Sequence, residues 1–194
     1  MPKDCAMTKS DLRLRYTEKR QTLSQDEVLS LSEKIFENFL VRFKPVPSQK
    51  IHCFLPITEK KEINTRIFIQ YFFDHQIRVY VPKVSHGKLI SVEITRETAY
   101  IKSFWNILEP ESNIDSEEKD FDFVITPLLY CDDEGNRVGY GKGFYDEFFD
   151  TVSPNALKIG VSIFPPAEKI DDVSEGDIPL DYLVTPTEVL SFRG

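Results

Sequence analysis

The residue types best suited to chemistry lie in one segment, which reads Gly-Asn-Arg-Val-Gly-Tyr-Gly-Lys-Gly-Phe-Tyr-Asp from Gly135 to Asp146. The whole chain has 8 glycines, and four of them fall here: Gly135, Gly139, Gly141 and Gly143. Glycine allows positive φ and lets backbone N–H groups approach an anion without a Cβ in the way. Lys142 adds a full positive charge. An apolar stretch precedes the segment and a helix is expected from Phe144, so the pattern predicts an anion held by loop amides and a helix N-terminus.

Two standard nucleotide motifs do not match this segment. The Walker A pattern needs a glycine where Asn136 stands, and a Ser or Thr where Gly143 stands. The dinucleotide pattern is GxGxxG, whereas this loop reads GxGxG. A hairpin or bulge whose glycines only permit tight turns is the alternative, and spacing alone leaves both interpretations open.

Charged residues elsewhere fit the same chemistry. Lys9 and Arg13 are four residues apart, so on a helix they share a face from which both could reach the same phosphate chain. A solvated helix face is the alternative interpretation of this spacing. Magnesium bound with a nucleotide takes one or two carboxylates together with phosphate oxygens. Asp146, directly after the glycines, is the metal candidate that its position in the sequence suggests.

The glycine-rich segment resembles the GNRLGxGKGYYD signature of the 5-formyltetrahydrofolate cyclo-ligases, also called methenyltetrahydrofolate synthetases. Val138 replaces Leu and Phe144 replaces Tyr. Residues 9–13 resemble the family's K-x-x-L-R element, which contacts ATP, and residues 177–185 resemble its terminal D-x-x-x-D-x-x-V-T element. Five such pieces follow one another in order from about Lys9 to Thr185.

Two of these pieces imply a folate site. The stretch from Leu55 to Glu62 resembles the family segment in which an aliphatic residue and a Glu bind the folate. A carboxylate accepts two adjacent pterin N–H groups well, and Glu59 is the alternative to Glu62. Residues 105–110 resemble the family's W-x-I-P-x-P stretch, with Leu108 in place of Pro. Its Trp105 is suited to stacking on a flat heterocycle.

The resemblance implies an enzyme that converts 5-formyltetrahydrofolate and ATP into 5,10-methenyltetrahydrofolate, ADP and phosphate, with Mg²⁺. Its implied catalytic residues are Lys142, Arg137 and Tyr145. The ATP-binding residues would be Lys9, Arg13, Arg137, Gly139, Tyr140, Gly141, Lys142, Gly143, Phe144 and Tyr145. The substrate-binding residues would be Leu55, Glu62, Trp105 and Tyr145, and the metal ligands Asp146 and Asp177. Asp177 lies in the terminal element, where Asp181 is the alternative and spacing does not decide between the two. Two alternatives are another ATP-dependent small-molecule kinase or ligase, and a non-catalytic α/β ligand-binding domain.

The elements that must position these residues follow from caps and periodicity. Thr8 with Asp11, and Ser24 with Glu27, predict N-caps of two helices, and Asn64 predicts the cap of a third. Apolar stretches predict strands at 51–55, 77–84, 89–95, 121–131, 157–164 and 182–185. Strands alternating with helices predict an α/β fold, layered helix–sheet–helix with a mainly parallel central sheet, formed by one domain over residues 1–194.

Composition narrows the function classes. The formal net charge of -8 argues against nucleic acid as a partner. No apolar run approaches the roughly 18 residues of a membrane span, and the N-terminus does not read as a signal peptide. Three separated cysteines without a CxxC pattern indicate reduced thiols. We therefore expect a cytoplasmic protein, monomeric or weakly homo-oligomeric, that acts on a small molecule, including polyglutamylated folate.

Overall fold

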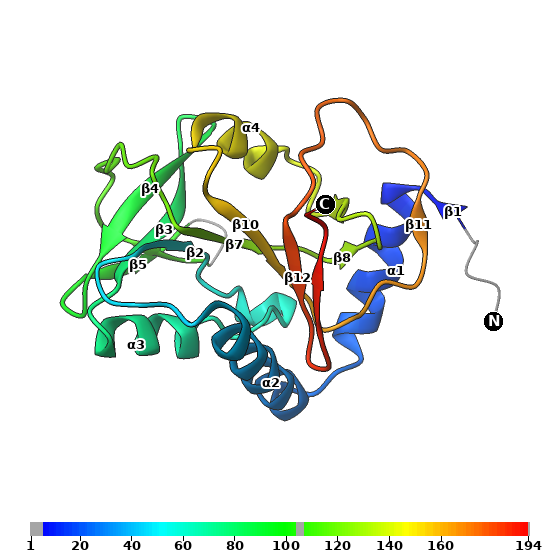
Figure 1. Cartoon of the computed structure of the whole chain (residues 1–194), viewed down its shortest axis with the longest axis horizontal. Helices are drawn as coiled ribbons and strands as arrows, with labels where there is room; N and C mark the ends of the chain where they lie inside the picture. The colour runs from blue at the N-terminus through cyan, green and yellow to red at the C-terminus, as the bar shows by residue number, and fades with distance from the viewer. Residues whose placement is uncertain (1–5, 104–106, 194) are drawn as a thin grey trace.

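The computed structural model describes residues 6–103 and 107–193 (Figure 1). Its helices are α1 (Lys9–Gln21), α2 (Gln25–Phe43), α3 (Arg66–Asp74) and α4 (Phe144–Thr151), with a 3-10 turn η1 (Thr58–Lys60). The strands of the central sheet are β2 (Lys50–Cys53), β3 (Arg78–Ser85), β4 (Lys88–Ile94), β7 (Phe123–Pro127), β10 (Leu157–Val161), β12 (Tyr182–Val184) and β13 (Val189–Ser191). Short two-stranded ladders join β1 (Ala6–Met7) to β11 (Lys169–Ile170), β5 (Tyr100–Lys102) to β6 (Leu108–Pro110), and β8 (Tyr130–Cys131) to β9 (Arg137–Val138).

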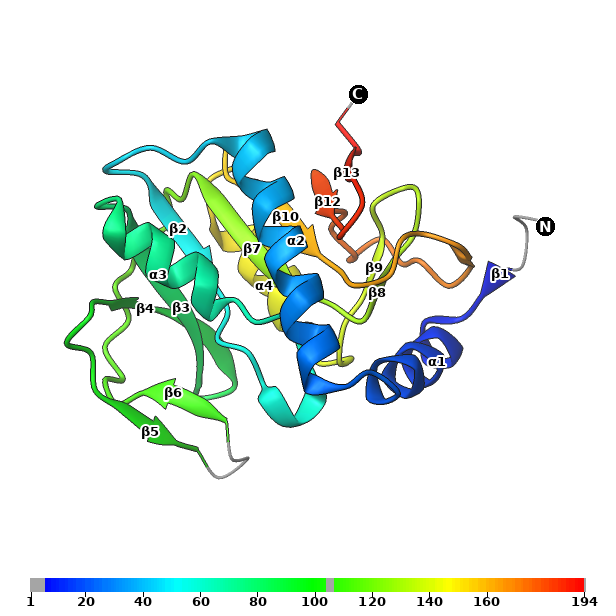
Figure 2. The same cartoon turned by 90° about the horizontal axis from the view of Figure 1, so that it is seen from below.

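The central sheet is mainly parallel, as predicted. Its strand order is β13-β12-β10-β7-β2-β3-β4, and the five inner strands, β12, β10, β7, β2 and β3, run parallel to one another. The two outer strands, β13 and β4, are antiparallel. Helices α2 and α3 cover one face and α4 covers the other (Figures 1 and 2). The helix–sheet–helix layering is therefore confirmed.

The direction of the crossovers reverses between β2 and β7. From β2 the chain crosses through α3 to β3, whereas from β7 it crosses through α4 to β10 on the other side. The two strands are neighbours, with Cys53 opposite Ile125. Open parallel sheets bind ligands outside the carboxyl ends of their strands, at such a switch point. The loops that follow β2 and β7 are therefore the segments to search for a site.

The first two helices begin at the predicted caps. The Thr8 hydroxyl accepts the N–H of Asp11, 3.2 Å away, and Ser24 and Glu27 form a reciprocal capping box. The third helix begins one residue later than predicted. Its N-cap is Thr65, whose hydroxyl donates to the Phe54 carbonyl at 2.5 Å instead of capping the helix, while Asn64 Oδ1 accepts the Arg66 N–H at 3.3 Å. The bond from Thr65 to the segment that follows β2 is a tertiary contact that helix-cap signals do not reveal.

Two clusters hold the layers together. Phe39, Phe68 and Phe72 are fully buried between the sheet and the pair α2 and α3. Val124 and Phe148 pack on the opposite face, under α4. Along the described residues, no helix is long and apolar enough to cross a membrane.

A third cluster docks α1 against the β8–β9 hairpin. Leu12 and Tyr16 of α1 are buried against Tyr130 and Val138 of the hairpin. The Tyr16 and Tyr130 rings stack with their centroids 4.3 Å apart. This packing fixes the side of α1 that carries Lys9 and Arg13 close to the glycine-rich segment.

The strand predicted over 121–131 is interrupted. β7 ends at Pro127, and β8 begins at Tyr130 as part of the separate hairpin with β9. At the break, the Arg20 guanidinium donates to the Leu128 carbonyl at 2.5 Å. A continuous apolar run cannot reveal this break, because a side chain distant in sequence satisfies the carbonyl that leaves the ladder.

Candidate active site

The glycine-rich segment divides into two halves. In the first half, Gly135 has φ of 86° and turns the chain into β9, so the hairpin interpretation holds there. In the second half, Gly141 and Gly143 have φ of 79° and 71°. Gly143 is the N-cap of α4 and provides no side-chain cap for the helix. The second half thus retains the geometry on which the anion prediction rests, a left-handed glycine loop entering an open helix N-terminus.

Arg13 lies directly against this loop. Its Nε donates to the Gly139 carbonyl at 2.9 Å. A Cβ at Gly141 would lie 3.2 Å from an Arg13 terminal nitrogen, so a larger residue would require the Arg13 side chain to shift. Lys142, the next residue, is exposed. The structure therefore brings together the α1 face and the glycine loop that the sequence nominated separately.

The two metal candidates lie beside each other in ion pairs. Lys9 Nζ is paired with Asp177, and Arg137 is paired with Asp146 at 2.7 Å. The same Asp146 oxygen accepts the N–H of Ile178, 3.1 Å away, the residue after Asp177. Partial burial opposes the ionisation of Asp177, but hydrogen bonds from Lys9 and Ser174 outweigh it and hold the pKa of Asp177 below its ordinary value.

This donor set suits a magnesium ion that is shared with a nucleotide. Among the described residues, no group of three or more His, Cys, Asp or Glu side chains could hold a metal. Over the same residues, Oδ2 of Asp146 and Oδ1 of Asp177 accept no hydrogen bond. One free oxygen from each of two carboxylates is what Mg²⁺ takes when phosphates and water complete its octahedron.

Asp181, the alternative metal ligand, is engaged elsewhere. Its Oδ2 accepts the Lys158 N–H at 2.7 Å and lies 3.3 Å from Lys158 Nζ. Its Oδ1 lies 3.5 Å from Arg193 Nε. Asp181 thus holds β10 and the end of the chain together, and the geometry favours Asp177.

Of the residues expected to bind folate, Glu62 follows β2 at the switch point and is only 6% exposed. Its Oε1 accepts the Tyr140 hydroxyl at 2.5 Å, and its Oε2 accepts the Ile57 N–H at 2.7 Å. Burial raises the pKa of Glu62, while these two hydrogen bonds and the charges of Arg20 and Lys60 oppose the rise. A carboxylate has about four acceptor positions, so about two remain for donors on a ligand.

The remaining candidates on this side have different surroundings. Leu55 is half-buried against the core, and Glu59 is exposed in η1. The Tyr145 hydroxyl is buried and has no hydrogen-bond partner within the described part of the chain. Burial raises the pKa of Tyr145, and the neighbouring Cys53 and Glu62 add to the effect. Phe144 opens α4, and Trp105 lies outside the described residues.

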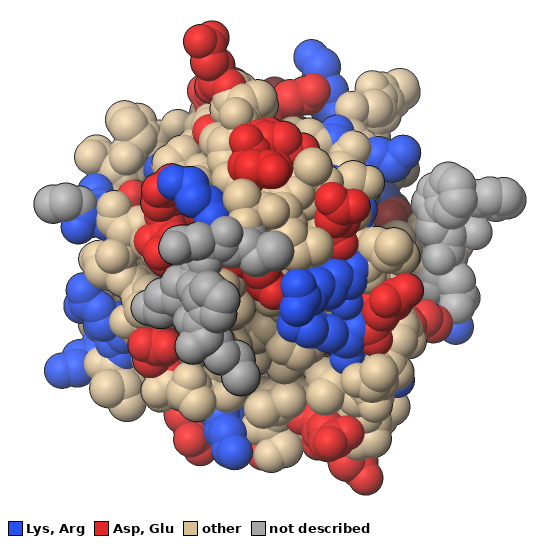
Figure 3. Space-filling view, turned by 90° about the vertical axis from the view of Figure 1, so that its right-hand side faces the viewer, with Lys and Arg blue, Asp and Glu red and all other residues tan. Residues whose placement is uncertain are grey.

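One cluster of positive charge lies on the face that carries α1. Figure 3 shows Lys and Arg side chains gathered beside a hollow, with Asp and Glu side chains around them. A few converging cations can create a local positive potential in a protein whose net charge is -8. An anionic ligand is therefore compatible with the acidic composition.

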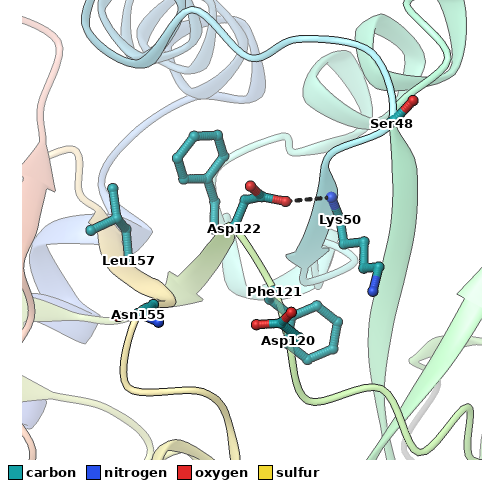
Figure 4. Close-up of a pocket in the computed structure, with 8 residues that line it drawn as sticks. Ser48, Lys50, Asp120, Phe121, Asp122, Asn155 and Leu157 are labelled. Carbon is teal, nitrogen blue, oxygen red and sulfur yellow. Dashed lines mark hydrogen bonds between the residues drawn. The ribbon is translucent and has the colours of Figure 1, made fainter.

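A cavity lies at the other end of the strands, away from the loops described above (Figure 4). It is lined by residues at the amino ends of β2, β7 and β10, among them Lys50, Asp122 and Asn155. The Lys50 N–H donates to Asp122 at 2.8 Å, and Lys50 Nζ pairs with Glu118 at 2.8 Å. Since such sheets bind ligands at their carboxyl ends, we do not assign this cavity to the active site.

Sequence reasoning missed Arg20, the buried cation of α1. The signal was available in the helical spacing. Arg20 follows Leu12 and Tyr16 at intervals of four residues, on the face that is buried. It also extends the basic side of the helix that begins with Lys9 and Arg13.

The fold is a doubly wound, mainly parallel sheet, and its switch point carries a glycine loop, several cations and two carboxylates. This arrangement is typical of α/β proteins that bind anionic, nucleotide-like ligands. The profile of the 5-formyltetrahydrofolate cyclo-ligase family matches residues 6–186. The chain therefore belongs to that family and is an enzyme, an ATP-dependent ligase of folate metabolism.

Individual relatives agree over most of their length. The chain is 29% identical to the 5-formyltetrahydrofolate cyclo-ligase of Mycoplasma pneumoniae over 92% of this chain and 98% of the relative. The NMR structure of 5,10-methenyltetrahydrofolate synthetase from Aquifex aeolicus superposes with a TM-score of 0.79 and 29% identity, covering 97% of this chain and 94% of the other. The structure of the 5,10-methenyltetrahydrofolate synthetase from Mycoplasma pneumoniae superposes with a TM-score of 0.73 and 25% identity. The match covers 93% of this chain and 99% of the other.

Proposed function

We propose that the chain converts 5-formyltetrahydrofolate and ATP into 5,10-methenyltetrahydrofolate, ADP and phosphate, with Mg²⁺. The observation that carries the proposal is the contact between Tyr140 of the glycine loop and Glu62 of the β2–α3 loop, 2.5 Å across the switch point. It supports the proposal because the segment expected to bind the nucleotide meets the segment expected to bind folate, as transfer of a phosphoryl group between the two ligands requires.

The chemistry explains why ATP is needed. The N5-formyl group is an amide, so its carbon is a poor electrophile and its oxygen a poor leaving group. Transfer of the γ-phosphoryl group to the formyl oxygen, with ADP as the leaving group, corrects both defects. N10 then attacks the activated carbon, its proton is released, and phosphate leaves as the ring closes. Such a reaction asks the protein mainly for positioning and for neutralisation of charge.

The basic residues supply that neutralisation. Arg13 and the exposed Lys142 flank Gly141, where they would meet the phosphate chain together with the loop amides. Arg137, only 8% exposed at its side chain, is held by Asp146 and by the ring of Phe149, 4.8 Å from its guanidinium carbon. Lys142 would neutralise the transferring γ-phosphoryl group, and Arg137 would support it from behind the loop.

Asp146 and Asp177 would hold the magnesium ion through their free oxygens. When bound, Mg²⁺ would neutralise charge on the nucleotide phosphates. Lys9, paired with the other oxygen of Asp177, would add a positive charge beside them. On the folate side, Glu62 would accept pterin N–H groups, and Leu55, Trp105 and Tyr145 would line the ring.

The experiment is a spectrophotometric assay with 5-formyltetrahydrofolate and Mg-ATP, because the methenyl product absorbs in the near ultraviolet. We expect product formation, and about a 10³-fold loss of turnover in Lys142→Ala, in line with the loss of a cation that stabilises phosphoryl transfer. Lys34→Ala, an exposed change on α2, serves as the charge control. ATP hydrolysis that does not depend on the folate would indicate another kinase or ligase, and binding without turnover a non-catalytic domain.

We also propose the setting in which the enzyme works. The two described cysteines, Cys53 and Cys131, are free and buried, which suits a reducing cytoplasm. The net charge of -8 disfavours nucleic acid and anionic membrane surfaces as partners. The chain is taken as one domain, monomeric or weakly homo-oligomeric, with mono- and polyglutamylated folates as its substrates.

A further inference from the structure

A buried cation, Arg20, joins the three segments of the site. It lies on α1 and is 3% exposed. One terminal nitrogen donates to the Leu128 carbonyl at 2.5 Å, and the other lies 3.4 Å from the Tyr140 hydroxyl. Tyr140 in turn donates to Glu62 at 2.5 Å. The chain of contacts runs from α1 through the glycine loop to the folate loop.

The network answers an electrostatic problem at Glu62. A buried carboxylate is costly unless hydrogen bonds and nearby cations stabilise its charge. No side-chain cation within the described residues forms an ion pair with Glu62. The groups that face it are Tyr140 before α4, Tyr145 on α4, Arg20 on α1 and Lys60 on η1.

Of the two cations, Arg20 is the better placed to act on Glu62. Lys60 is exposed, with its Nζ 3.9 Å from the centre of the Tyr140 ring, so solvent and salt screen its charge. Arg20 is buried, so its charge is screened less. Its Nε is also buried and has no acceptor among the described residues, so the contact with Leu128 alone does not account for a full guanidinium.

We propose that Arg20 is a positioning residue for the folate site, which acts through the Tyr140 hydroxyl to keep Glu62 ionised and oriented toward the pterin. This inference rests on the proposed function of Glu62. The competing role for Arg20 is purely structural, as the donor that satisfies the Leu128 carbonyl at the end of β7. The two roles differ in how activity depends on pH.

The sign of the expected change follows from the charge. Removing the cation raises the pKa of the Glu62 carboxyl, because an opposite charge nearby favours the ionised form. Binding that needs the carboxylate is lost as pH falls through that higher pKa. The acidic limb of kcat/KM for the folate must therefore move to higher pH, and activity must recover at alkaline pH.

The test compares pH profiles of kcat/KM for 5-formyltetrahydrofolate at saturating Mg-ATP. In Arg20→Met we expect the acidic limb of the profile to shift to higher pH by about 1 to 2 units, the range found for a cation near a carboxylate. We also expect KM for the folate to rise more than KM for ATP. Arg20→Lys, which keeps the positive charge, should bring the acidic limb most of the way back to its position in the unmodified enzyme. Arg96→Met, which removes an exposed Arg paired with Asp74, should leave the profile unchanged.

A folded Arg20→Met enzyme whose activity drops equally at every pH overturns the inference in favour of the structural role. Should Arg20→Met not fold, Arg20→Gln decides, because it removes the charge and keeps an N–H donor for the Leu128 carbonyl. An unshifted limb in Arg20→Gln then overturns the inference. Absence of methenyl product with the unmodified enzyme is a different result, which refutes the proposed function itself.

Discussion

At the scale of single residues, two glycines of the loop have similar backbones but different neighbours. Gly141 and Gly143 both have positive φ, which costs a residue with a Cβ about 1 kcal/mol. A Cβ at Gly143 meets nothing within 4 Å, whereas one at Gly141 lies 3.2 Å from the Arg13 guanidinium. The pair thus separates backbone strain from the contact with Arg13.

We predict that Gly143→Ala lowers the free energy of unfolding by about 1 kcal/mol from strain alone. Gly141→Ala should lower it by about 2 kcal/mol, since Arg13 must also shift. Urea unfolding of both variants measures the difference. In an Arg13→Met background the two substitutions should have the same effect. A difference that persists there would mean that the loop is crowded by something other than Arg13.

His52 supplies a pH prediction at the same scale. It is fully buried on β2, and its ring nitrogens have no hydrogen-bond partner within the described ranges. The centres of the His52 and Phe148 rings are 4.5 Å apart. Burial lowers the pKa of His52 to about 3. Between pH 6.5 and pH 3 the unfolded chain binds a proton at this position and the folded chain does not, so acid favours unfolding.

Between pH 7 and pH 5, His52 should therefore remove about 2 kcal/mol of stability. The variant His52→Leu should show a correspondingly flatter dependence of the free energy of unfolding on pH over this range. His86→Asn, at an exposed turn with positive φ that Asn tolerates, should keep the full dependence. Equal slopes for the unmodified protein and His52→Leu would show that His52 has an acceptor or donor in the folded state.

At the scale of elements, the two N-caps allow stability to be separated from function. Thr8 caps α1, which carries Lys9 and Arg13, whereas Ser24 caps α2, which packs on the core. Replacing either cap by Ala should cost about 1 kcal/mol. Only Thr8→Ala should also raise KM for ATP, by several-fold, because fraying of α1 loosens the residues that meet the phosphates. Steady-state kinetics at a temperature where both variants are folded tests this, and an equal rise in KM for Ser24→Ala would contradict it.

The elements that could be predicted from the sequence are those with local signals. The caps at Thr8 and Ser24 predicted the starts of α1 and α2, and the alternation of strands with helices predicted the parallel sheet. The break at Leu128 was not predictable, because Arg20, which satisfies the freed carbonyl, lies 108 residues away along the chain. The start of α3 at Thr65 was missed for a similar reason, since the Thr65 hydroxyl bonds to Phe54 and not to its own helix.

At the scale of the whole molecule, the site assembles from segments that the topology brings together. The sequence nominated Glu62 and Tyr140 separately, the one for folate and the other for ATP. Their contact spans 78 residues, and only the reversal of strand order between β2 and β7 accounts for it. Side-chain contacts across a switch point depend on which strands become neighbours, and a single sequence does not state this order.

The same topology predicts how the molecule unfolds. The seven-stranded sheet is continuous across the switch point, and the cluster beneath α2 and α3 includes residues from β2, β3, β7, β10 and β12. We therefore propose that the chain unfolds as one cooperative unit. Urea transitions followed by far-UV and near-UV circular dichroism should coincide.

Mg-ATP should move this transition as a whole. At about 100 times its dissociation constant, a ligand that binds only the folded state adds about 2.7 kcal/mol to the free energy of unfolding. Since the nucleotide would contact both α1 and the loop before α4, the two spectroscopic signals should shift together, and ATP without Mg²⁺ should shift them less. In Lys142→Ala the shift should shrink while the transition stays single. If Mg-ATP moved the urea transition in only one of the two circular dichroism signals, α1 and the β8–β9 hairpin would form a unit that unfolds apart from the sheet. The one-domain proposal would then fail.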